Sequence, residues 1–189
     1  LNASGISPSN VADLSNPVGS EVFSSLKLNE ISFSYPSSDK PVLDKVSLSI
    51  NAGEIIGIVG STGSGKTTLI NVMLGLLKSS SGETLVNGNS VDDNLQALRK
   101  FVAYLPQQIF LTDDSLRNNI ALGIQSNKIS DTKIWTILKK VRLEEFVEDL
   151  PEGLDTMVGE HGMRLSGGQC QRVALARSLY HDRSMLVLD

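Results

Sequence analysis

A short glycine-rich stretch with one lysine constrains this chain more than any other part of its sequence. Residues 60–68 read Gly-Ser-Thr-Gly-Ser-Gly-Lys-Thr-Thr, which fits the phosphate-loop pattern G-x-x-x-x-G-K-[ST]. The apolar run at residues 54–59 predicts a buried parallel strand before the loop. The run at residues 69–77 predicts a helix after it. Because strand, glycine loop and helix in this order are the context that the motif requires, we expect an α/β fold.

The chemistry of phosphate binding explains the residue types in the loop. Glycine at positions 60, 63 and 65 lets the backbone bend tightly, so that consecutive N–H groups converge on phosphate oxygens. Lys66 brings a positive charge to the β- and γ-phosphates, and the Thr67 hydroxyl is suited to ligate Mg²⁺. The alternative is a glycine-rich turn with a solvated lysine, which leaves the flanking strand and helix unexplained. The residues predicted to contact nucleotide are Gly60, Ser61, Thr62, Gly63, Ser64, Gly65, Lys66, Thr67 and Thr68.

Composition excludes several other classes of protein. The chain of 189 residues has a net charge of −4 and no basic run, which argues against nucleic acid as the main partner. Its longest apolar runs, at residues 55–59 and 185–188, fall far short of the ~20 residues of a membrane span. Any membrane attachment must therefore come through another segment or chain. Cys170 is the only cysteine, so we expect neither an internal disulfide nor a cysteine metal cluster.

The rest of the chain predicts an α/β core interrupted by a helical insert. Residues 1–24 are rich in Ser, Asn, Gly and Pro and are interpreted as a linker. Asn87-Gly88 is a strong hairpin signal. Apolar positions from Ile134 to Val141 recur at helical spacing within the polar region 109–165. Strands are expected at residues 27–34, 42–50, 83–86, 101–105 and 185–189, and helices at 92–100 and 169–180.

A second motif, Leu-Ser-Gly-Gly-Gln, occupies residues 165–169. Alone it is an ordinary helix start, because serine caps a helix and glycine gives the backbone freedom. Downstream of a phosphate loop and ahead of an apolar strand, it resembles the LSGGQ signature of the ATP-binding cassette (ABC) family. In that family the signature faces the phosphate loop of a second cassette. The resemblance implies that these residues contact the γ-phosphate in trans: Ser166, Gly167, Gly168 and Gln169.

Three other positions match the nucleotide site of the same family. Residues 185–189 resemble the Walker B strand, which implies that Asp189 holds Mg²⁺ together with Thr67. Gln107 resembles the Q-loop glutamine, which would reach Mg²⁺ or the attacking water. Tyr35 lies where the family places the aromatic ring that stacks on adenine, with surface packing as the alternative. The implied catalytic residues are Lys66, Gln107 and Asp189.

Residues 156–162, Thr-Met-Val-Gly-Glu-His-Gly, resemble the X-loop (TxVGExG) of exporter-type cassettes. The resemblance implies that Glu160 lies near the transmembrane partner; the alternative is a polar loop before a helix. Residues 115–120 also look like exporter sequence, particularly that of lipid-linked oligosaccharide and polysaccharide flippases.

The sequence departs from the family's pattern in three places. Cys170 replaces the basic residue that usually follows the signature, and His161 stands where arginine is common. The sequence stops at Asp189, where the family's general-base glutamate would come next. We therefore expect negligible ATP hydrolysis by residues 1–189 alone, even where ATP binding survives.

Taken together, the resemblance implies a P-loop NTPase core, mostly a parallel sheet with an antiparallel β subdomain, plus a helical ABC-specific subdomain at about residues 109–180. Residues 1–24 would be a linker from a transmembrane domain and residues 25–189 a partial ATP-binding domain. The implied function is that of an ABC exporter, coupling MgATP binding, head-to-tail dimerisation and hydrolysis to transport of a lipid-linked saccharide, lipid or hydrophobic substrate. The implied partners are a transmembrane domain and a second nucleotide-binding domain, at the cytoplasmic face of the cell (inner) membrane.

Two alternatives stay open. A soluble ABC ATPase of DNA repair would carry a long coiled coil in its helical region, and no heptad run occurs here. Translation-type ATPases are tandem cassettes without the X-loop run. The second alternative is a nucleotide-binding module that does not hydrolyse ATP.

Overall fold

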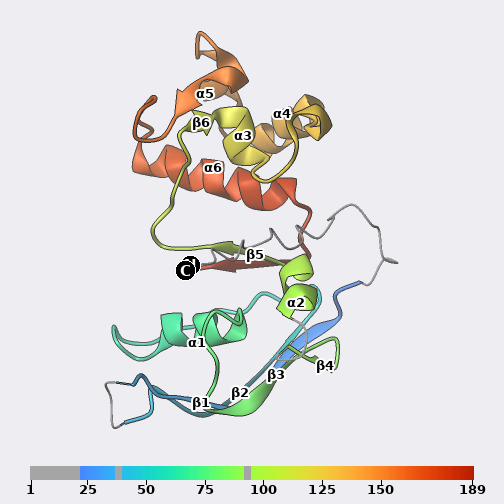
Figure 1. Ribbon diagram of the computed structural model, residues 1–189, viewed down its shortest axis with the longest axis vertical. Coiled ribbons are helices and arrows are strands. Elements are labelled where there is room, and N and C mark those ends of the chain that lie inside the picture. The colour runs from blue at the N-terminus through green and yellow to red at the C-terminus, as the bar shows by residue number, and fades with distance from the viewer. Residues whose placement is uncertain (1–21, 37–39, 92–94) are drawn as a thin grey trace, which may run out of the picture.

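The computed structural model describes residues 22–36, 40–91 and 95–189, and these fold around two hydrophobic cores (Figure 1). The first core lies between an antiparallel sheet, the phosphate-loop helix and a short parallel strand pair. The second core holds a group of helices together above that pair in Figure 1. Residues 1–21 of the expected linker, 37–39 of the expected turn and 92–94 of the expected short helix lie outside the described residues.

The antiparallel sheet has the strand order β2-β1-β3-β4. A bulge in β1 explains why its buried positions do not alternate strictly. The pairing register shifts between Leu28 and Ile31, where Glu30 has a φ of 47°. The extra residue turns both Leu28 and Ile31 toward the core, where both are fully buried. The strands are β1 (Ser25–Phe33), β2 (Leu43–Asn51), β3 (Ser81–Val86) and β4 (Asn89–Ser90).

The expected hairpin at Asn87-Gly88 is present between β3 and β4. Val86 pairs with Asn89, and the two loop residues have φ values of 51° and 81°. Positive φ at both positions is the geometry of the two-residue turn that this dipeptide favours. The local signal was therefore sufficient to identify the turn.

The helix after the phosphate loop, α1 (Lys66–Met73), is shorter than the run at residues 69–77 suggested and begins earlier. It ends where Gly75 adopts a φ of 66° and its N–H donates to the Val72 carbonyl (2.9 Å). A side chain on Gly75 would also collide with Leu95, since an added Cβ would lie 2.2 Å from Leu95 Cδ2. The glycine thus ends the helix and permits close packing.

The prediction of a buried strand at residues 54–59 is wrong for this structure. These residues form no strand in the described part of the chain, Ile55 is fully exposed and Val59 is 93% exposed. An extended segment becomes a strand only when a neighbour pairs with its N–H and C=O groups. None of the sheets in the described residues includes residues 54–59, so apolar composition alone did not suffice.

Two parallel strands, β5 (Val102–Leu105) and β8 (Met185–Leu188), separate the cores (Figure 1). Met185 and Val187 point into the first core, whereas Leu186 and Leu188 are exposed. The strands expected at residues 101–105 and 185–189 are therefore present, and β8 has one buried and one exposed face. The helix before β5 is α2 (Leu95–Phe101), in which Leu98 and Phe101 are buried.

The helical half contains the expected insert. The periodic positions of α4 are all buried, namely Ile134, Ile137, Leu138 and the following Val141. No helix in the described ranges is long and apolar enough to cross a membrane. The helices are α3 (Leu116–Ile120), α4 (Asp131–Lys140), α5 (Glu144–Glu148) and α6 (Gly167–Tyr180), with the 3-10 turns η1 (Ser126–Lys128) and η2 (Gly153–Asp155) and the strand pair β6 (Asp114–Ser115) and β7 (Met157–Val158).

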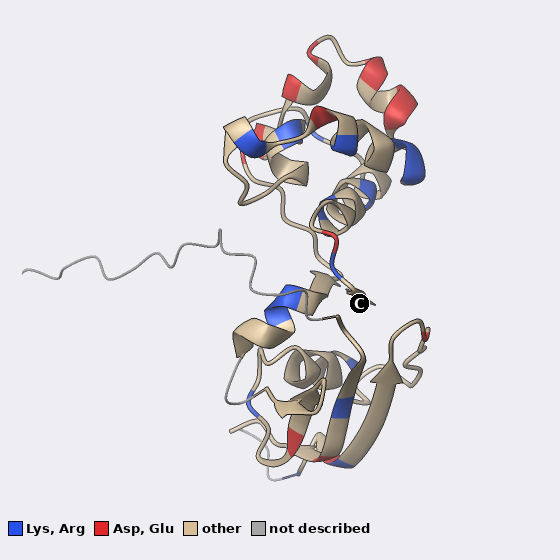
Figure 2. Ribbon diagram, turned by 90° about the vertical axis from the view of Figure 1, so that its right-hand side faces the viewer, with Lys and Arg blue, Asp and Glu red and all other residues tan. Residues whose placement is uncertain are grey.

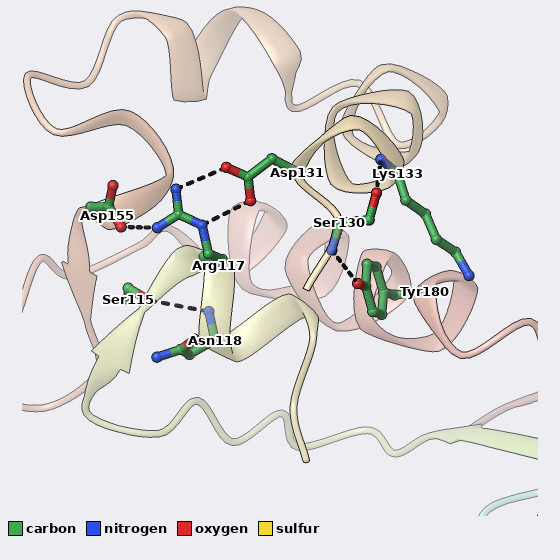
Figure 3. Close-up of polar contacts among 8 residues, drawn as sticks. All are labelled: Ser115, Arg117, Asn118, Ser130, Asp131, Lys133, Asp155 and Tyr180. Carbon is green, nitrogen blue, oxygen red and sulfur yellow. Dashed lines mark hydrogen bonds and ion pairs between the residues drawn. The ribbon is translucent and has the colours of Figure 1, made fainter. Parts of the chain in front are cut away.

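Polar contacts join these helices (Figure 3). Arg117 of α3 donates through Nε and Nη2 to the two oxygens of Asp131 (2.9 and 3.1 Å) and pairs with Asp155. The backbone N–H of Ser130 donates to the Tyr180 hydroxyl (3.0 Å). These contacts join α3 to the start of α4 and to η2, and they join the start of α4 to the end of α6.

Candidate nucleotide site

The phosphate loop lies in front of α1 as an exposed turn. Gly65 is the N-cap of the helix, with a φ of 93°, and an added Cβ there would lie 3.1 Å from both Val42 Cγ1 and the Val42 carbonyl. Only glycine fits this position without strain. No side chain caps the helix, so its first N–H groups are directed at whatever binds in front of it.

Lys66 is anchored to the loop itself. Its ammonium donates to the carbonyls of Gly60 (2.9 Å) and Ser61 (2.8 Å). The positive charge therefore lies next to the turn whose N–H groups are suited to phosphate. Phosphate oxygens in place of these two carbonyls would add the attraction between a full negative charge and the ammonium.

The structure brings Thr67 and Asp189 together across 122 residues of sequence: Thr67 Oγ1 donates to Asp189 Oδ1 (3.3 Å). Tyr104 donates its hydroxyl to the other carboxylate oxygen (3.4 Å). Burial, followed by the charge of Asp189 and this hydrogen bond, raises the pKa of Tyr104. Tyr104 was not expected from sequence, because a tyrosine inside an apolar strand gives no signal that it faces a carboxylate.

This donor set fits Mg²⁺. A hydroxyl and a carboxylate are hard oxygen ligands, and Mg²⁺ commonly takes one or two protein oxygens, with phosphates and waters completing its octahedron. The described residues contain no group of three or more His, Cys, Asp or Glu side chains able to hold a metal by themselves. A metal at Thr67 and Asp189 would therefore bind together with a phosphate ligand.

Tyr35 and Gln107 lie near this centre in different ways. The Tyr35 hydroxyl shares a hydrogen bond with Thr68 Oγ1 (3.2 Å), and its ring packs edge-on against Phe33 at 4.9 Å. Tyr35 as a whole residue is 39% exposed, so it is partly accessible to a ligand. Gln107 is exposed and follows β5, whose end pairs in register with Leu188, next to Asp189.

The signature residues lie on the other side of the parallel strands. Figure 1 shows α1 below the β5–β8 pair and α6 above it. Ser166 caps α6 through a capping box: its hydroxyl accepts from the Gln169 N–H (3.3 Å), and its own N–H donates to Gln169 Oε1 (2.8 Å). Gly167 and Gly168 are exposed at this helix start. Their predicted contact with a nucleotide in trans stays a prediction.

His161, which stands where arginine is common in the family, is hydrogen-bonded to Asp113. Asp113 accepts a hydrogen bond from the His161 N–H (3.1 Å) and pairs with its Nδ1. The loop can approach Asp113 this closely because residue 159 is glycine with a φ of 110°, where an added Cβ would lie 2.9 Å from Asp113 Cα. The hydrogen bond from His161 lowers the pKa of Asp113, and Asp113 in turn raises that of His161.

The loop, the helix behind it and the paired Thr67 and Asp189 define a P-loop nucleotide-binding domain. Residues 43–189 match the family model described as ABC transporter. Because this match covers most of the chain, the chain belongs to the ABC transporter family and has the ABC ATPase domain fold. Membership implies ATP binding, and it confirms the family and fold class predicted from the two motifs.

Three proteins similar to this chain are named as flippases or as an exporter. The chain is 43% identical over 166 residues to the ATP-dependent lipid A-core flippase of Pseudoalteromonas translucida (strain TAC 125), covering 87% of this chain and 28% of that protein. It is 42% identical over 165 residues to the flippase of the same name from Pseudomonas aeruginosa, covering 87% and 27%. A solved bacterial Atm1-family ABC exporter with ATP bound superposes with a TM-score of 0.82 at 32% identity, covering 95% of this chain and 31% of that one. The chain thus spans less than a third of the length of these relatives.

Proposed function

We propose that this chain is the ATP-binding domain of an exporter-type ABC transporter and that it binds MgATP at residues 60–68. The main support for the proposal is the hydrogen bond from Thr67 Oγ1 to Asp189 Oδ1 (3.3 Å), beside the loop that contains Lys66. Phosphate charge would be balanced by Lys66 and by Mg²⁺ held between Thr67 and Asp189. Tyr35 would stack on the base, and Gln107 would reach the metal or the attacking water.

Hydrolysis would take place between two copies of the domain. Catalysis of phosphoryl transfer is mainly positioning and charge stabilisation. The exposed start of α6, with Ser166 and Gly168, offers a second set of N–H groups to a γ-phosphate held by another copy. We infer a head-to-tail arrangement in which each site takes its loop from one copy and its signature from the other. Residues 25–189 would be the domain that pairs, preceded by a linker at residues 1–24.

The transported substrate is inferred from the relatives. Two of them are named as lipid A-core flippases and another as an exporter, so a lipid-linked saccharide, lipid or other hydrophobic substrate fits best. A transmembrane domain would be the principal partner, and this domain would lie at the cytoplasmic face of the membrane. Figure 2 shows basic and acidic segments interleaved in the helical half, which agrees with a partner other than nucleic acid.

The test of nucleotide binding is Lys66→Ala. The variant should bind ATP more weakly, because the phosphates lose their nearest fixed positive charge, while its unfolding temperature without nucleotide should change little. Equilibrium titration and thermal unfolding measure the two quantities. The matched control is Lys128→Ala, which removes an exposed lysine from η1 in the helical half. Equal ATP affinity in the Lys66→Ala and wild-type proteins would exclude the proposed site.

A further inference from the structure

Tyr104 lies on the same face of the β5–β8 pair as Asp189. In the parallel register Tyr104 is opposite Val187. The Asp189 N–H donates to the Leu105 carbonyl (3.0 Å), so the pairing continues one residue beyond β8. Side chains two positions apart on a strand point to the same face, as Val187 and Asp189 do. Val187 is buried in the first core and Tyr104 packs against that core, so the shared face is the one toward α1 (Figure 1).

The two oxygens of the Asp189 carboxylate have different partners. Oδ1 accepts from the Thr67 hydroxyl (3.3 Å), and Oδ2 accepts from the Tyr104 hydroxyl (3.4 Å). The Thr67 oxygen keeps its lone pairs for a metal while its proton is donated. A tyrosine hydroxyl carries its proton at neutral pH, so Tyr104 is the donor in its contact. One carboxylate oxygen therefore faces the proposed metal ligand Thr67, and the other is held by Tyr104.

The number of carboxylate oxygens that can reach a metal affects which metal is preferred. Ca²⁺ accepts a carboxylate through one oxygen or through both, in a flexible geometry, whereas Mg²⁺ requires a nearly ideal octahedron. A hydrogen bond to Oδ2 opposes binding through both oxygens and limits rotation of the carboxylate. Groups that orient a metal-binding side chain in this way matter, because their loss lowers metal affinity by about 10- to 100-fold.

We propose that Tyr104 is a positioning residue that presents a single oxygen of Asp189 to the metal, and that it thereby favours Mg²⁺ over Ca²⁺ in the nucleotide site. The proposal rests on the proposed function, because the metal is expected to bind there together with the phosphates of ATP. Tyr104 needs no contact with the metal or the nucleotide. It acts through Oδ2, so its hydroxyl is decisive and its ring is not.

Tyr104→Phe isolates the hydroxyl. It removes the hydrogen bond to Asp189 and keeps the ring that packs against the first core. The matched control is Tyr180→Phe in the helical half. It too loses one tyrosine hydroxyl, which accepts from the Ser130 N–H (3.0 Å, Figure 3). The two variants remove the same atom and one hydrogen bond each, so a difference between them reports on the nucleotide site.

The first measurement is equilibrium titration of the full-length transporter that carries this domain, with a non-hydrolysable ATP analogue. It is made in excess Mg²⁺, in excess Ca²⁺ and in EDTA. With Mg²⁺, Tyr104→Phe should bind the analogue about tenfold more weakly than the wild type. With Ca²⁺ the loss should be much smaller, and in EDTA there should be none, since residues 60–68 are unchanged. Tyr180→Phe should match the wild type in all three solutions. Equal losses with both metals, or no loss with Mg²⁺, would overturn the proposal.

The second measurement asks whether the hydroxyl acts through the carboxylate. In an Asp189→Ala background, Tyr104→Phe should cause no further loss of affinity in Mg²⁺, because residues that act as one unit have non-additive effects. Losses that add would show that the Tyr104 hydroxyl acts through some other group, and the proposal would then be wrong.

A purely structural role for Tyr104 predicts a different result. Tyr104→Phe would then have a lower unfolding temperature, and its affinity for the analogue would change equally in Mg²⁺, Ca²⁺ and EDTA. That pattern would refute the proposal. If the wild type binds the analogue with Mg²⁺ and Tyr104→Phe binds it equally well, only the role of Tyr104 is refuted. If the wild type fails to bind the analogue in every solution, the proposed function is refuted and this proposal with it.

Discussion

At the scale of single residues, the two histidines lie in contrasting electrostatic surroundings. Nδ1 of His161 is paired with the Asp113 carboxylate, which raises the pKa of His161 above its ordinary value of 6.5. His181 follows α6 and is half-buried. Burial, and after it the positive charge of Arg183, lowers the pKa of His181. Protonation is therefore favoured at one histidine and opposed at the other.

We expect a proton NMR titration to show His161 with the higher pKa and His181 with the lower one. The contribution of His161 to stability is complete below its unfolded pKa and is lost as pH rises through its folded pKa. The contribution of His181 is present above its unfolded pKa and is lost as pH falls through its folded pKa. Asp113→Asn should bring the pKa of His161 back toward 6.5 and leave His181 unchanged. The reverse order of the two pKa values would contradict the described contacts.

Tyr35 allows the ring and the hydroxyl to be tested separately. If the exposed part of the ring stacks on the base, Tyr35→Ala should weaken ATP and GTP binding alike, by ~1–3 kcal/mol. Tyr35→Phe keeps the ring and loses only the hydrogen bond to Thr68, so it should retain most of the affinity. Titration with both nucleotides measures this. Unchanged affinities in Tyr35→Ala would mean that the ring serves only to pack against Phe33.

At the scale of elements, three helices in the described part of the chain, α3, α4 and α6, begin with a serine cap, and only the cap of α6 is expected to act in the nucleotide site. Ser166 accepts from the Gln169 N–H at the start of α6 (3.3 Å), and Ser130 accepts from the Lys133 N–H at the start of α4 (3.3 Å). Loss of such a cap costs about 0.5–2 kcal/mol. The two positions therefore make a matched pair.

Ser166→Ala and Ser130→Ala should lower the free energy of unfolding by similar amounts, about 1 kcal/mol each. Only Ser166→Ala should lower ATP turnover by the transporter, because Ser166 is proposed to meet the γ-phosphate of a second copy. Denaturant unfolding and phosphate release give the two quantities. Equal losses of turnover in both variants would show that Ser166 acts through stability alone.

The elements also show where local signals succeed. The turn at Asn87-Gly88 and the buried positions from Ile134 to Val141 were predicted correctly, because each depends on the conformation of neighbouring residues. The strand expected at residues 54–59 was not, because pairing depends on a distant segment. The bulge at Glu30 likewise depends on a distant segment and was not predicted. Leu28 and Ile31 share a face only because of how β1 pairs with β2.

At the scale of the whole molecule, the loop and the signature lie on opposite sides of the β5–β8 pair (Figure 1). The proposed site, which contains both, would therefore require a second copy of the domain. The protein to test is the isolated domain extended to include the general-base glutamate, since residues 1–189 alone are expected not to hydrolyse ATP. Its rate of ATP turnover should rise more than linearly with its concentration. Mixing Lys66→Ala with Ser166→Arg should restore activity, because one of the two sites in the mixed dimer keeps an intact loop and an intact signature.

Phosphate release against concentration, for each variant alone and for the mixture, measures this shared site. Each variant alone should be inactive at every concentration, which is the control for residual activity. Turnover proportional to concentration, together with an inactive mixture, would show that each copy hydrolyses ATP by itself.

The sequence by itself determined the phosphate loop, the signature and the family. Residues 60–68 and 165–169 carry their chemistry in local spacing, since a glycine turn and a helix start act through their own N–H groups. That spacing can be read without knowing which segments become neighbours.

Only the tertiary structure decided which distant groups meet. The resemblance already placed Thr67 with Asp189, but it gave no sign that Tyr104 reaches the same carboxylate or that Arg177 reaches Asn119 and Phe110. Each of these contacts joins residues at least 58 positions apart. Such contacts depend on strand order and helix packing, which no short pattern encodes. Residues 54–59 likewise needed a distant strand as a pairing partner, and without one among the residues that the structure describes they are not part of a sheet. The physical reason is that hydrogen-bond partners are selected by position in space, and the folded chain alone supplies that position.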